Sequence, residues 1–308
     1  MSFVFAENIN PYLVDAQNIM VERRSTPISK VPPIGIGNKP IDGGYYLFTE
    51  KERDEFIEKE PLSRNLFKPW MGADELLHGY KRYCLYVKDC LPSELQKMPE
   101  VLKRIKLVKK YRLNSKSIPT QKLANYPLSF HVTNIPKSDY ILIPSTTSNK
   151  RKYIPIRFID KNIISSNTTH IIANATLYHF GILESNVHMV WMRSVCGRLG
   201  TGYVYSKDIV YNNFIWPNPT QKQKEAIEKA AQAVLDARDL YPDSTLADLY
   251  DPNTMPLELV KAHEKLDNAV KAAYGNEGFE TEEEIVASLM KLYKEAIDKE
   301  NAEKKSIS

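Results

Sequence analysis

The last third of this 308-residue chain has a different hydrophobic period from the rest, and this change constrains the fold more than any other feature. From residue 222 onward apolar residues recur every three or four positions, as between Ile227 and Leu235. That spacing predicts an amphipathic helix. A second helical run begins near Pro256 and meets a stop signal at Gly275.

A third helix is predicted to begin at Thr281, because Glu284 follows three residues later in the pattern of a capping box. We expect these helices to form a small C-terminal domain over residues 222–308. The charged residues opposite the apolar stripes are typical of a solvated surface.

Residues 1–221 alternate short strand-like segments with turns. The segments rich in β-branched and aromatic residues are 45–48, 82–87, 139–144, 151–159, 169–174 and 202–206. They follow one another without crossover helices, which favours antiparallel pairing. The sequence therefore predicts an α+β fold, with a mixed, mainly antiparallel sheet domain over residues 1–221 followed by the helical domain.

Charge is divided unevenly between these two parts, although the net charge of the chain is only +4. Residues 1–221 carry 30 Lys and Arg against 19 Asp and Glu, a net charge of +11. Residues 222–308 carry 12 against 19, a net charge of −7. The excess in the first part is typical of a surface that binds a polyanion such as nucleic acid.

Several classes of protein are disfavoured by composition. With 43% hydrophobic and 26% charged residues the chain reads as globular, and it has no apolar run near the roughly 20 residues that span a bilayer. The first residues lack the pattern of a signal peptide, so the expected location is the cytoplasm, with no membrane partner. Three cysteines without a C-x-x-C pair indicate neither a disulfide framework nor a zinc site.

The stretch VCGRLGTGYVYS, residues 195–206, contains three glycines within six residues. It lacks the Lys and Ser or Thr of a Walker loop, and a strand-like segment follows it where a dinucleotide fingerprint needs a helix. We expect a glycine turn between two extended segments, MVWMRSVCG and GYVYS. Such a turn would place Arg198 and Thr201 at a protruding tip.

A second tip is predicted between DYILIP and RKYIPIRFI. Hydroxyls, an amide and cations at a turn suit contacts to DNA bases and phosphates. The base-reading candidates here are Ser145, Thr146, Thr147, Ser148 and Asn149, and the phosphate candidates are Lys150, Arg151 and Lys152.

A basic helix is predicted over residues 98–117, with an apolar period through Val101, Ile105, Val108 and, less clearly, Arg112. The phosphate candidates on this helix are Lys103, Arg104, Lys106, Lys109, Lys110 and Arg112. The simplest interpretation of this helix is a basic surface exposed to solvent. Because the basic helix occurs together with two polar tips, however, nucleic-acid binding is favoured.

No catalytic constellation stands out in the sequence. His170, His179, His188 and His263 have neither zinc-protease nor deaminase spacing, so we expect structural or surface roles and no metal site. No G-x-S-x-G is present. Asn10-Pro11-Tyr12 is only half of an amino-methyltransferase motif, and no glycine-rich cofactor loop precedes it.

Long ordered runs of the chain resemble one known family. They include RRSTPISKVPPIGIGNKPIDGGYYLF, YILIPSTTSNKRKYIPI, FGILESNVHMVWMRSVCGRL and LADLYDPNTMPLELVKAHEKLDNAVKAAYG. These runs are similar to the C-terminal part of MmeI-like adenine-N6 DNA methyltransferases of restriction-modification systems. In that family this part is a target-recognition domain followed by a helical C-terminal domain.

The resemblance implies a module for recognition of double-stranded DNA that is not an enzyme by itself. Catalytic motifs lie upstream in the family, so S-adenosylmethionine would be held by a catalytic domain that this chain lacks, and no cofactor is expected here. Residues between the GRL and YS elements vary with the recognised sequence in such proteins. Carried over, the base-reading candidates are Gly200, Thr201, Gly202, Tyr203 and Val204.

Gly-Thr-Gly departs from the polar residues common there and offers only the Thr201 hydroxyl and backbone groups. Arg193 and Arg198 could hold phosphates or form structural ion pairs, and the sequence does not choose between these roles. The segment around Met189–Met192 is expected to be core.

Two function classes remain open. The first is a DNA-recognition module that binds duplexes with a steep salt dependence and without S-adenosylmethionine. The second is an interaction or specificity subunit that docks through its acidic helices on a separate methyltransferase chain. A stand-alone enzyme is the remaining alternative.

Overall fold

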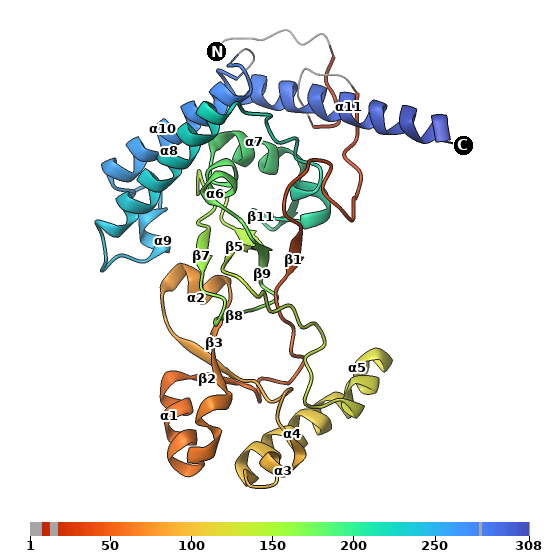
Figure 1. The fold of residues 1–308 in the computed structure, drawn as a ribbon, viewed down its shortest axis with the longest axis vertical. Helices are drawn as coiled ribbons and strands as arrows, with labels where there is room; N and C mark the ends of the chain where they lie inside the picture. The colour runs from red at the N-terminus through yellow and green to blue at the C-terminus, as the bar shows by residue number, and fades with distance from the viewer. Residues whose placement is uncertain (1–7, 13–17, 277–278, 308) are drawn as a thin grey trace. The chain divides into compact units, whose positions relative to one another are not determined.

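The computed structural model describes residues 8–12, 18–276 and 279–307. The chain divides into two compact units (Figure 1). The sheet unit comprises Gly35–Leu142 and Arg157–Ala173, and the helical unit comprises Met1–Ile34, Ile143–Ile156 and Asn174–Ser308. The division at residue 221 expected from the sequence stays a prediction about sequence domains, since these units are defined by contacts in space.

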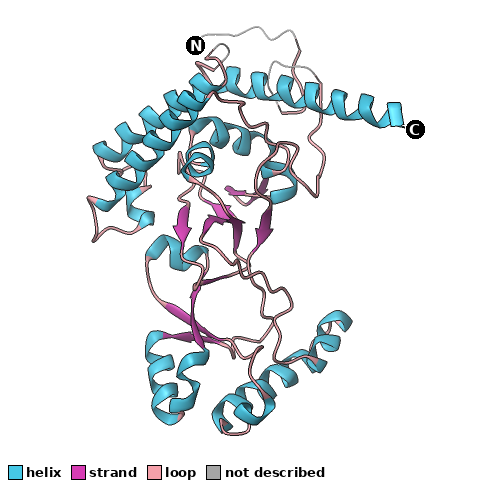
Figure 2. Ribbon diagram, viewed as in Figure 1, coloured by secondary structure: helices cyan, strands magenta, loops and turns pink. Residues whose placement is uncertain are grey.

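The sheet unit contains most of the strands, shown as arrows in Figure 2. Its sheets have the strand orders β2-β4-β3-β8 and β1-β9-β5-β7. The strands are β1 (Ile34–Ile36), β2 (Leu47–Thr49), β3 (Phe67–Met71), β4 (Arg82–Leu85), β5 (Tyr140–Pro144), β7 (Arg157–Ile159), β8 (Ile164–Ser165) and β9 (Thr169–Ala173), with the ends of β1 and β5 assigned to the helical unit. β4 pairs antiparallel with β2 and β3, β5 pairs antiparallel with β7, and β3 pairs parallel with β8. The expected α+β fold with mainly antiparallel pairing is confirmed.

The helices of the sheet unit are α1 (Glu50–Lys59), η1 (Pro61–Leu66), α2 (Ala73–His78), α3 (Pro92–Leu95), α4 (Pro99–Leu113), α5 (Ile118–Lys122) and η2 (Leu123–Asn125). Of these, α1, η1, α3 and α4 contribute residues to one aromatic core. Phe48, Phe56 and Phe67 meet edge to face, with ring centroids 5.1 to 5.6 Å apart. The apolar stripe of α4 is buried in the same core, so a mixed sheet and the basic helix share one hydrophobic centre.

The helical unit contains α6 (Leu177–Leu183), α7 (Asn186–Val195), η3 (Lys207–Tyr211), α8 (Gln221–Asp239), α9 (Leu246–Leu249), α10 (Leu257–Ala273) and α11 (Glu282–Ile307). α8 packs against α10 and α6. Gly181 of α6 makes this possible, because a Cβ at that position would lie 2.8 Å from Ile227 Cγ2. No helix among the described residues is long and apolar enough to cross a bilayer.

The predicted helix ends in this unit are confirmed. The Thr281 hydroxyl accepts a hydrogen bond from Glu284 N at 3.2 Å, and the Glu284 carboxylate accepts one from Thr281 N at 3.3 Å. Gly275 follows the end of α10 with a φ of +100°, a conformation that glycine adopts without strain.

Two predicted strand segments are wrong. MVWMRSVCG was expected to be extended, but residues 186–195 form α7, and only Gly197–Leu199 is a strand. Residues 151–159 were expected to form one strand, but only Arg157–Ile159 pairs, while Tyr153–Ile156 is buried irregular chain. Both segments are rich in buried apolar and aromatic residues, and such a short run does not by itself distinguish a strand from a helix or a buried loop.

Candidate nucleic-acid interface

The two predicted tips meet in one small sheet of the helical unit. This tip sheet has the order β10-β11-β6, with β10 at Gly197–Leu199, β11 at Gly202–Val204 and β6 at Thr146–Thr147. In β11, Tyr203 pairs with Thr147 and Val204 with Thr146. Residues more than fifty positions apart in the sequence are therefore held side by side by main-chain hydrogen bonds.

The glycines of this region shape a tight hairpin, as predicted. Leu199 pairs with Gly202, so Gly200 and Thr201 form a two-residue loop. Gly200 has a φ of +58° at the first loop position, where a type II′ turn favours glycine. At Gly202 a Cβ would lie 3.0 Å from the Thr147 carbonyl oxygen, so glycine also allows β6 to approach.

Arg198 and Tyr203 face each other across the hairpin. The guanidinium carbon of Arg198 lies 4.0 Å from the centre of the Tyr203 ring, within the range of a cation–π contact. Arg198 is exposed, as are Leu199, Gly200 and Thr201, whereas Tyr203 is only 9% exposed. Arg198 and Thr201 of the hairpin are thus exposed to solvent, and the buried Tyr203 ring packs against the Arg198 guanidinium.

The second arm of the tip sheet exposes a different set of groups. Thr146, Asn149, Lys150 and Lys152 are exposed. The Ser148 hydroxyl accepts a hydrogen bond from Lys150 N at 3.2 Å, which closes the turn.

Three of the predicted tip contacts need correction. The hydroxyl oxygens of Ser145 and Thr147 are buried, and neither has a hydrogen-bond partner among the described residues. Neither can reach a base as the structure stands. The ring of Tyr203 is likewise almost fully covered, while Gly202 and Val204 are half-buried.

Arg193 forms a structural ion pair. Its Nη2 lies 2.8 Å from Glu282 Oε1, and its Nη1 donates to the Lys152 carbonyl at 3.1 Å. The side chain is only 18% exposed. Of the two roles left open for Arg193, the structure favours the ion pair.

Arg151 is also less available than its neighbours. It is half-buried, and its Nε has no hydrogen-bond partner in the part of the chain that the structure describes. Burial lowers the pKa of this guanidinium, and the nearby Asp251 opposes that shift. Lys150 and Lys152 are therefore the better phosphate candidates of this segment.

The basic helix α4 lies in the sheet unit and has two distinct faces. Val101, Ile105, Val108 and Arg112 are buried, as the period predicted. The lysines Lys103, Lys106, Lys109 and Lys110 are exposed. Lys103 is 3.7 Å from Glu100, and no carboxylate of the described residues lies within ion-pair distance of the other three.

Arg112 is the clearest correction among the phosphate candidates. Its side chain is 0% exposed. Its guanidinium donates to the carbonyl oxygens of Pro40, Ile41, Leu123, Tyr126 and Ser129, at 2.8 to 3.1 Å. These bonds use every N–H of the group, so Arg112 holds the chain together and does not meet phosphate.

Arg104 is intermediate between the exposed lysines of α4 and the buried Arg112. It is half-buried, and its guanidinium carbon is 4.8 Å from the centre of the Phe48 ring. Part of this cation is therefore engaged in the aromatic core.

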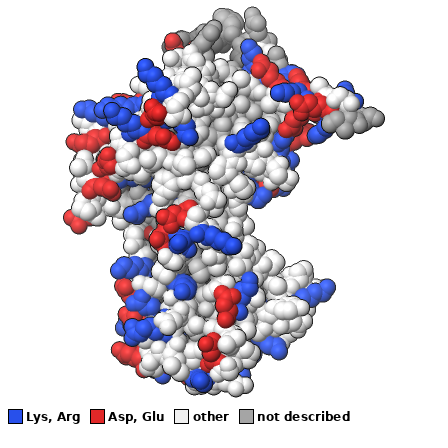
Figure 3. Space-filling view, viewed as in Figure 1, with Lys and Arg blue, Asp and Glu red and all other residues white. Residues whose placement is uncertain are grey.

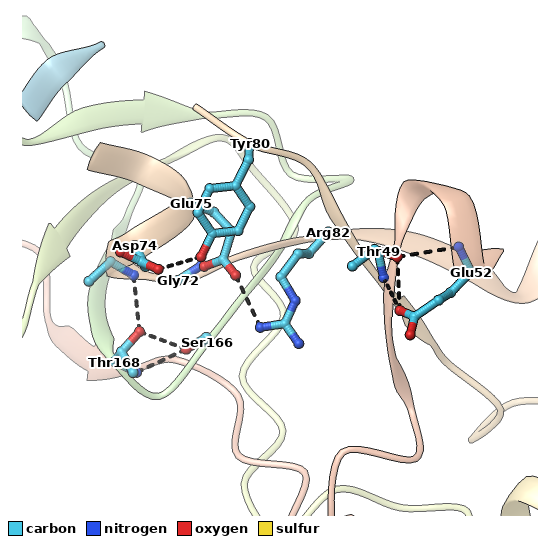
Figure 4. Close-up of polar contacts among 10 residues, drawn as sticks. Thr49, Glu52, Gly72, Asp74, Glu75, Tyr80, Arg82, Ser166 and Thr168 are labelled. Carbon is cyan, nitrogen blue, oxygen red and sulfur yellow. Dashed lines mark hydrogen bonds and ion pairs between the residues drawn. The ribbon is translucent and has the colours of Figure 1, made fainter. Parts of the chain in front are cut away.

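A polar cluster beside α2 was not predicted from the sequence (Figure 4). Glu75 is buried; its carboxylate accepts from Gly72 N at 2.8 Å and pairs with Arg82 Nη1 at 3.3 Å. The Thr168 hydroxyl caps the same helix by accepting from Ala73 N at 3.0 Å. A cavity of about 300 Å³ adjoins this cluster.

Cations from distant segments line that cavity, among them Lys81, Arg82 and Arg157. Arg82 lies on β4, Lys81 directly precedes β4, and Arg157 lies on β7 of the other sheet, so no local motif predicts that they come together. The only part of this cluster with a local sequence pattern is the Gly-Ala-Asp-Glu start of α2, where acidic residues in the first turn indicate a helix N-terminus.

Opposite charges are interspersed on the face shown in Figure 3, on both units. That face carries no uninterrupted field of one sign. Among the described residues no group of three or more His, Cys, Asp or Glu is placed to hold a metal ion.

Comparisons with known proteins all identify relatives among DNA methyltransferases and restriction-modification enzymes. Residues 15–218 match the model of the MmeI target recognition domain, and residues 219–299 match that of the MmeI C-terminal domain. DNA methyltransferase A of Bacillus subtilis (strain 168) is 40% identical over 292 residues, which are 95% of this chain and 33% of that protein. The chain thus spans about a third of this curated relative.

A solved structure agrees in fold over nearly the whole chain. It is that of the type IIL restriction-modification enzyme MmeI in complex with DNA, with a TM-score of 0.92 and 47% sequence identity. The match covers 95% of this chain and 39% of that one.

Proposed function

Because this chain belongs to the MmeI family, with its target recognition and C-terminal domains, we propose that it recognises a specific sequence in double-stranded DNA. It would do so as the recognition part of an S-adenosylmethionine-dependent adenine-N6 DNA methyltransferase. The observation that carries the proposal is the tip sheet, which gathers exposed polar groups from two distant segments on one three-stranded sheet.

The tip sheet offers groups of the right chemistry for reading base edges. Arg198 can donate two hydrogen bonds to guanine, and Thr201, Thr146 and Asn149 can donate or accept. All four are exposed. A rigid strand scaffold favours discrimination, since a wrong base then leaves a donor or acceptor unpaired.

Phosphate contacts are proposed separately for two sets of lysines. Lys150 and Lys152 flank the tip sheet in the helical unit, and Lys103, Lys106, Lys109 and Lys110 lie on α4 in the sheet unit. Each lysine that neutralises a phosphate releases condensed counterions, so binding should weaken as salt rises.

Methyl transfer is assigned to a part of the methyltransferase outside these residues. Reaching the amino group of adenine requires the base to leave the duplex and enter a catalytic pocket. We propose that this chain alone neither binds S-adenosylmethionine nor transfers a methyl group, and that it acts in the cytoplasm, where bacterial DNA lies.

The test is a binding selection from random duplexes, followed by titration of the recovered duplex and a scrambled one at two salt concentrations. We expect enrichment of a defined sequence, a steep loss of affinity with salt, and no methyl transfer from labelled S-adenosylmethionine. Recovery of no sequence preference would contradict recognition, and transfer of label by the purified chain would contradict the assignment of catalysis elsewhere.

A second role is compatible with the first. Exposed acidic side chains such as Glu225, Glu264 and Glu283 lie on α8, α10 and α11, and the chain spans only a third of its curated relative. These faces could dock on a separately encoded catalytic chain. Co-purification with such a chain, and its loss when the three glutamates are changed to glutamine, would establish docking.

A further inference from the structure

The segment that supplies β6 has little regular structure of its own. Residues 148–156 form turns and irregular chain. Tyr153, Ile154 and Ile156 are nevertheless at most 2% exposed. Their polar contacts are made with helices of the same unit, so those helices determine where this segment lies.

Asp267 of α10 is the central contact. Its Oδ2 accepts a hydrogen bond from the Tyr153 hydroxyl at 2.7 Å. Its Oδ1 accepts one from Asn186 N, at the start of α7, also at 2.7 Å. The Tyr153 ring stacks on His263 of the same helix, with centroids 3.9 Å apart. One buried carboxylate therefore joins the β6 segment, α7 and α10.

α7 leads directly into the hairpin. It ends at Val195, and β10 begins at Gly197. Asp267 thus contacts both arms of the tip sheet: the β6 arm through Tyr153 and the β10–β11 arm through the helix before it. An acceptor at the N-terminus of α7 also satisfies a helix N–H that has no partner within the helix.

Two further cations fix the same segment. Arg238 of α8 donates to the Ile156 carbonyl at 2.7 Å and to Glu184 Oε1 at 2.5 Å, and both charged groups are buried. Arg193 holds the Lys152 carbonyl while it pairs with Glu282 of α11. Residues 152–156 are therefore held by three helices of the C-terminal part. α8 and α10 contact them directly, and α11 acts through the ion pair of Glu282 with Arg193.

We propose that Asp267, assisted by Arg238, is a positioning residue for DNA sequence recognition, which makes the C-terminal helices part of the reading apparatus. The inference rests on the proposed function, because it assigns these residues to the tip sheet. If the tip sheet already has its DNA-binding conformation in the free protein, no conformational entropy is lost in ordering it on binding. Base contacts depend most on this preorganisation, because they require exact placement of donors and acceptors. Contacts of flexible lysines with phosphate depend on it little.

The experiment uses the full chain with Asp267→Asn, which keeps the size but offers one acceptor oxygen to two donors. The control is Asp236→Asn on α8, an exposed aspartate that accepts a hydrogen bond from Gln232 of the same helix. Two quantities are measured: the affinity ratio between the selected and a scrambled duplex, and hydrogen exchange of the amides of β6 and β11 in the free protein.

We expect Asp267→Asn to lower the affinity ratio by about tenfold, as for loss of one charge-assisted contact of about 1.4 kcal/mol. Binding of the scrambled duplex should change by less than about twofold, and exchange in β6 and β11 should accelerate while the middle of α8 stays protected. Asp236→Asn should match the unaltered chain. If Asp267→Asn does not fold, Tyr153→Phe removes one partner of the same contact and serves in its place.

An unchanged affinity ratio and unchanged exchange in a folded variant would overturn the positioning role while leaving the proposed function intact. Failure of the unaltered chain to select any sequence would instead overturn the proposed function, and the DNA-reading role with it. Whether the unaltered chain selects a sequence therefore distinguishes failure of the proposed function from failure of the positioning role alone.

Discussion

Arg198 stacks on Tyr203 directly across the β10–β11 hairpin, at 4.0 Å from guanidinium carbon to ring centre. No hydrogen bond or ion pair from the described residues engages the guanidinium of Arg198. Stacking restricts this long side chain at the surface, so less entropy is lost when it donates to a ligand. The pair is therefore a preorganised donor at the tip of the recognition module.

Changing Arg198 to Ala should weaken binding to the selected duplex by about 1 to 3 kcal/mol, the range of one bidentate base contact. Stability should stay within about 0.5 kcal/mol, since the side chain is exposed. Titration of the selected duplex and urea unfolding measure the two quantities. Arg53→Ala is the matched control, because Arg53 also stacks on a tyrosine, Tyr83, at 3.8 Å. Equal losses in both variants would contradict a specific role for Arg198.

The exposed lysines of α4 should act through phosphate alone. Lys106→Gln and Lys110→Gln are each expected to reduce the slope of log affinity against log salt by about 0.9, equally for selected and scrambled duplexes. The measurement is a salt titration of binding to both duplexes. Lys229→Gln, an exposed lysine of α8, is the control. A slope that stays at the unaltered value would exclude these lysines from the interface.

Arg112 should behave in the opposite way. Arg112→Met removes the donors of five backbone carbonyl oxygens and should destabilise the protein by about 3 kcal/mol or more. Urea unfolding measures the loss. A stable variant with a reduced salt slope would show that the buried geometry is wrong and that the residue meets DNA.

Acidification should destabilise the helical unit through His188. Burial lowers the pKa of His188 to about 3, from an ordinary value of 6.5. The unfolded chain therefore binds a proton that the folded chain excludes, and stability falls as pH drops below about 6.5, by about 1.4 kcal/mol per pH unit. Burial also lowers the pKa of His179 and His263 and raises that of Glu184, which acts in the opposite direction. The contribution of His188 is therefore the difference in slope between the unaltered chain and His188→Gln, measured by urea unfolding between pH 7 and pH 5. An identical slope in the variant would assign the acid sensitivity to other groups.

Gly200 and Gly202 of the hairpin should differ in their tolerance to substitution. Gly202→Ala places a Cβ 3.0 Å from the Thr147 carbonyl oxygen, so β6 should move away and its amides should exchange faster. In Gly200→Asn the added Cβ would meet no atom of the described residues within 4 Å, and asparagine tolerates the positive φ better than other residues with a side chain. Hydrogen exchange compares the two variants. Equal exchange in both would contradict the close approach of β6 and β11.

The helical part could be predicted well because its signals are local. The period of α8 and α10, the capping box at Thr281 and the stop at Gly275 each depend on neighbours within a few residues. The buried place of Arg112 was also signalled, since it continues the apolar stripe of Val101, Ile105 and Val108.

The misses have a common physical origin. Met189, Trp191 and Met192 of α7 are all buried, and a short apolar run such as MVWMRSVCG does not by itself distinguish a helix from a strand. The contact of Tyr153 with Asp267 joins positions 114 apart, and the pairing of β6 with β11 joins positions more than fifty apart. Such non-local contacts leave no trace in local composition.

The central claim is that the tip sheet reads the DNA sequence, and its most direct test compares duplexes selected from a random pool by two proteins. One is the unaltered chain, and the other carries Arg198→Ala and Thr201→Ala together. The account predicts one consensus for the unaltered chain and, for the variant, the same consensus with one or more base pairs relaxed. An identical consensus from both proteins would contradict it.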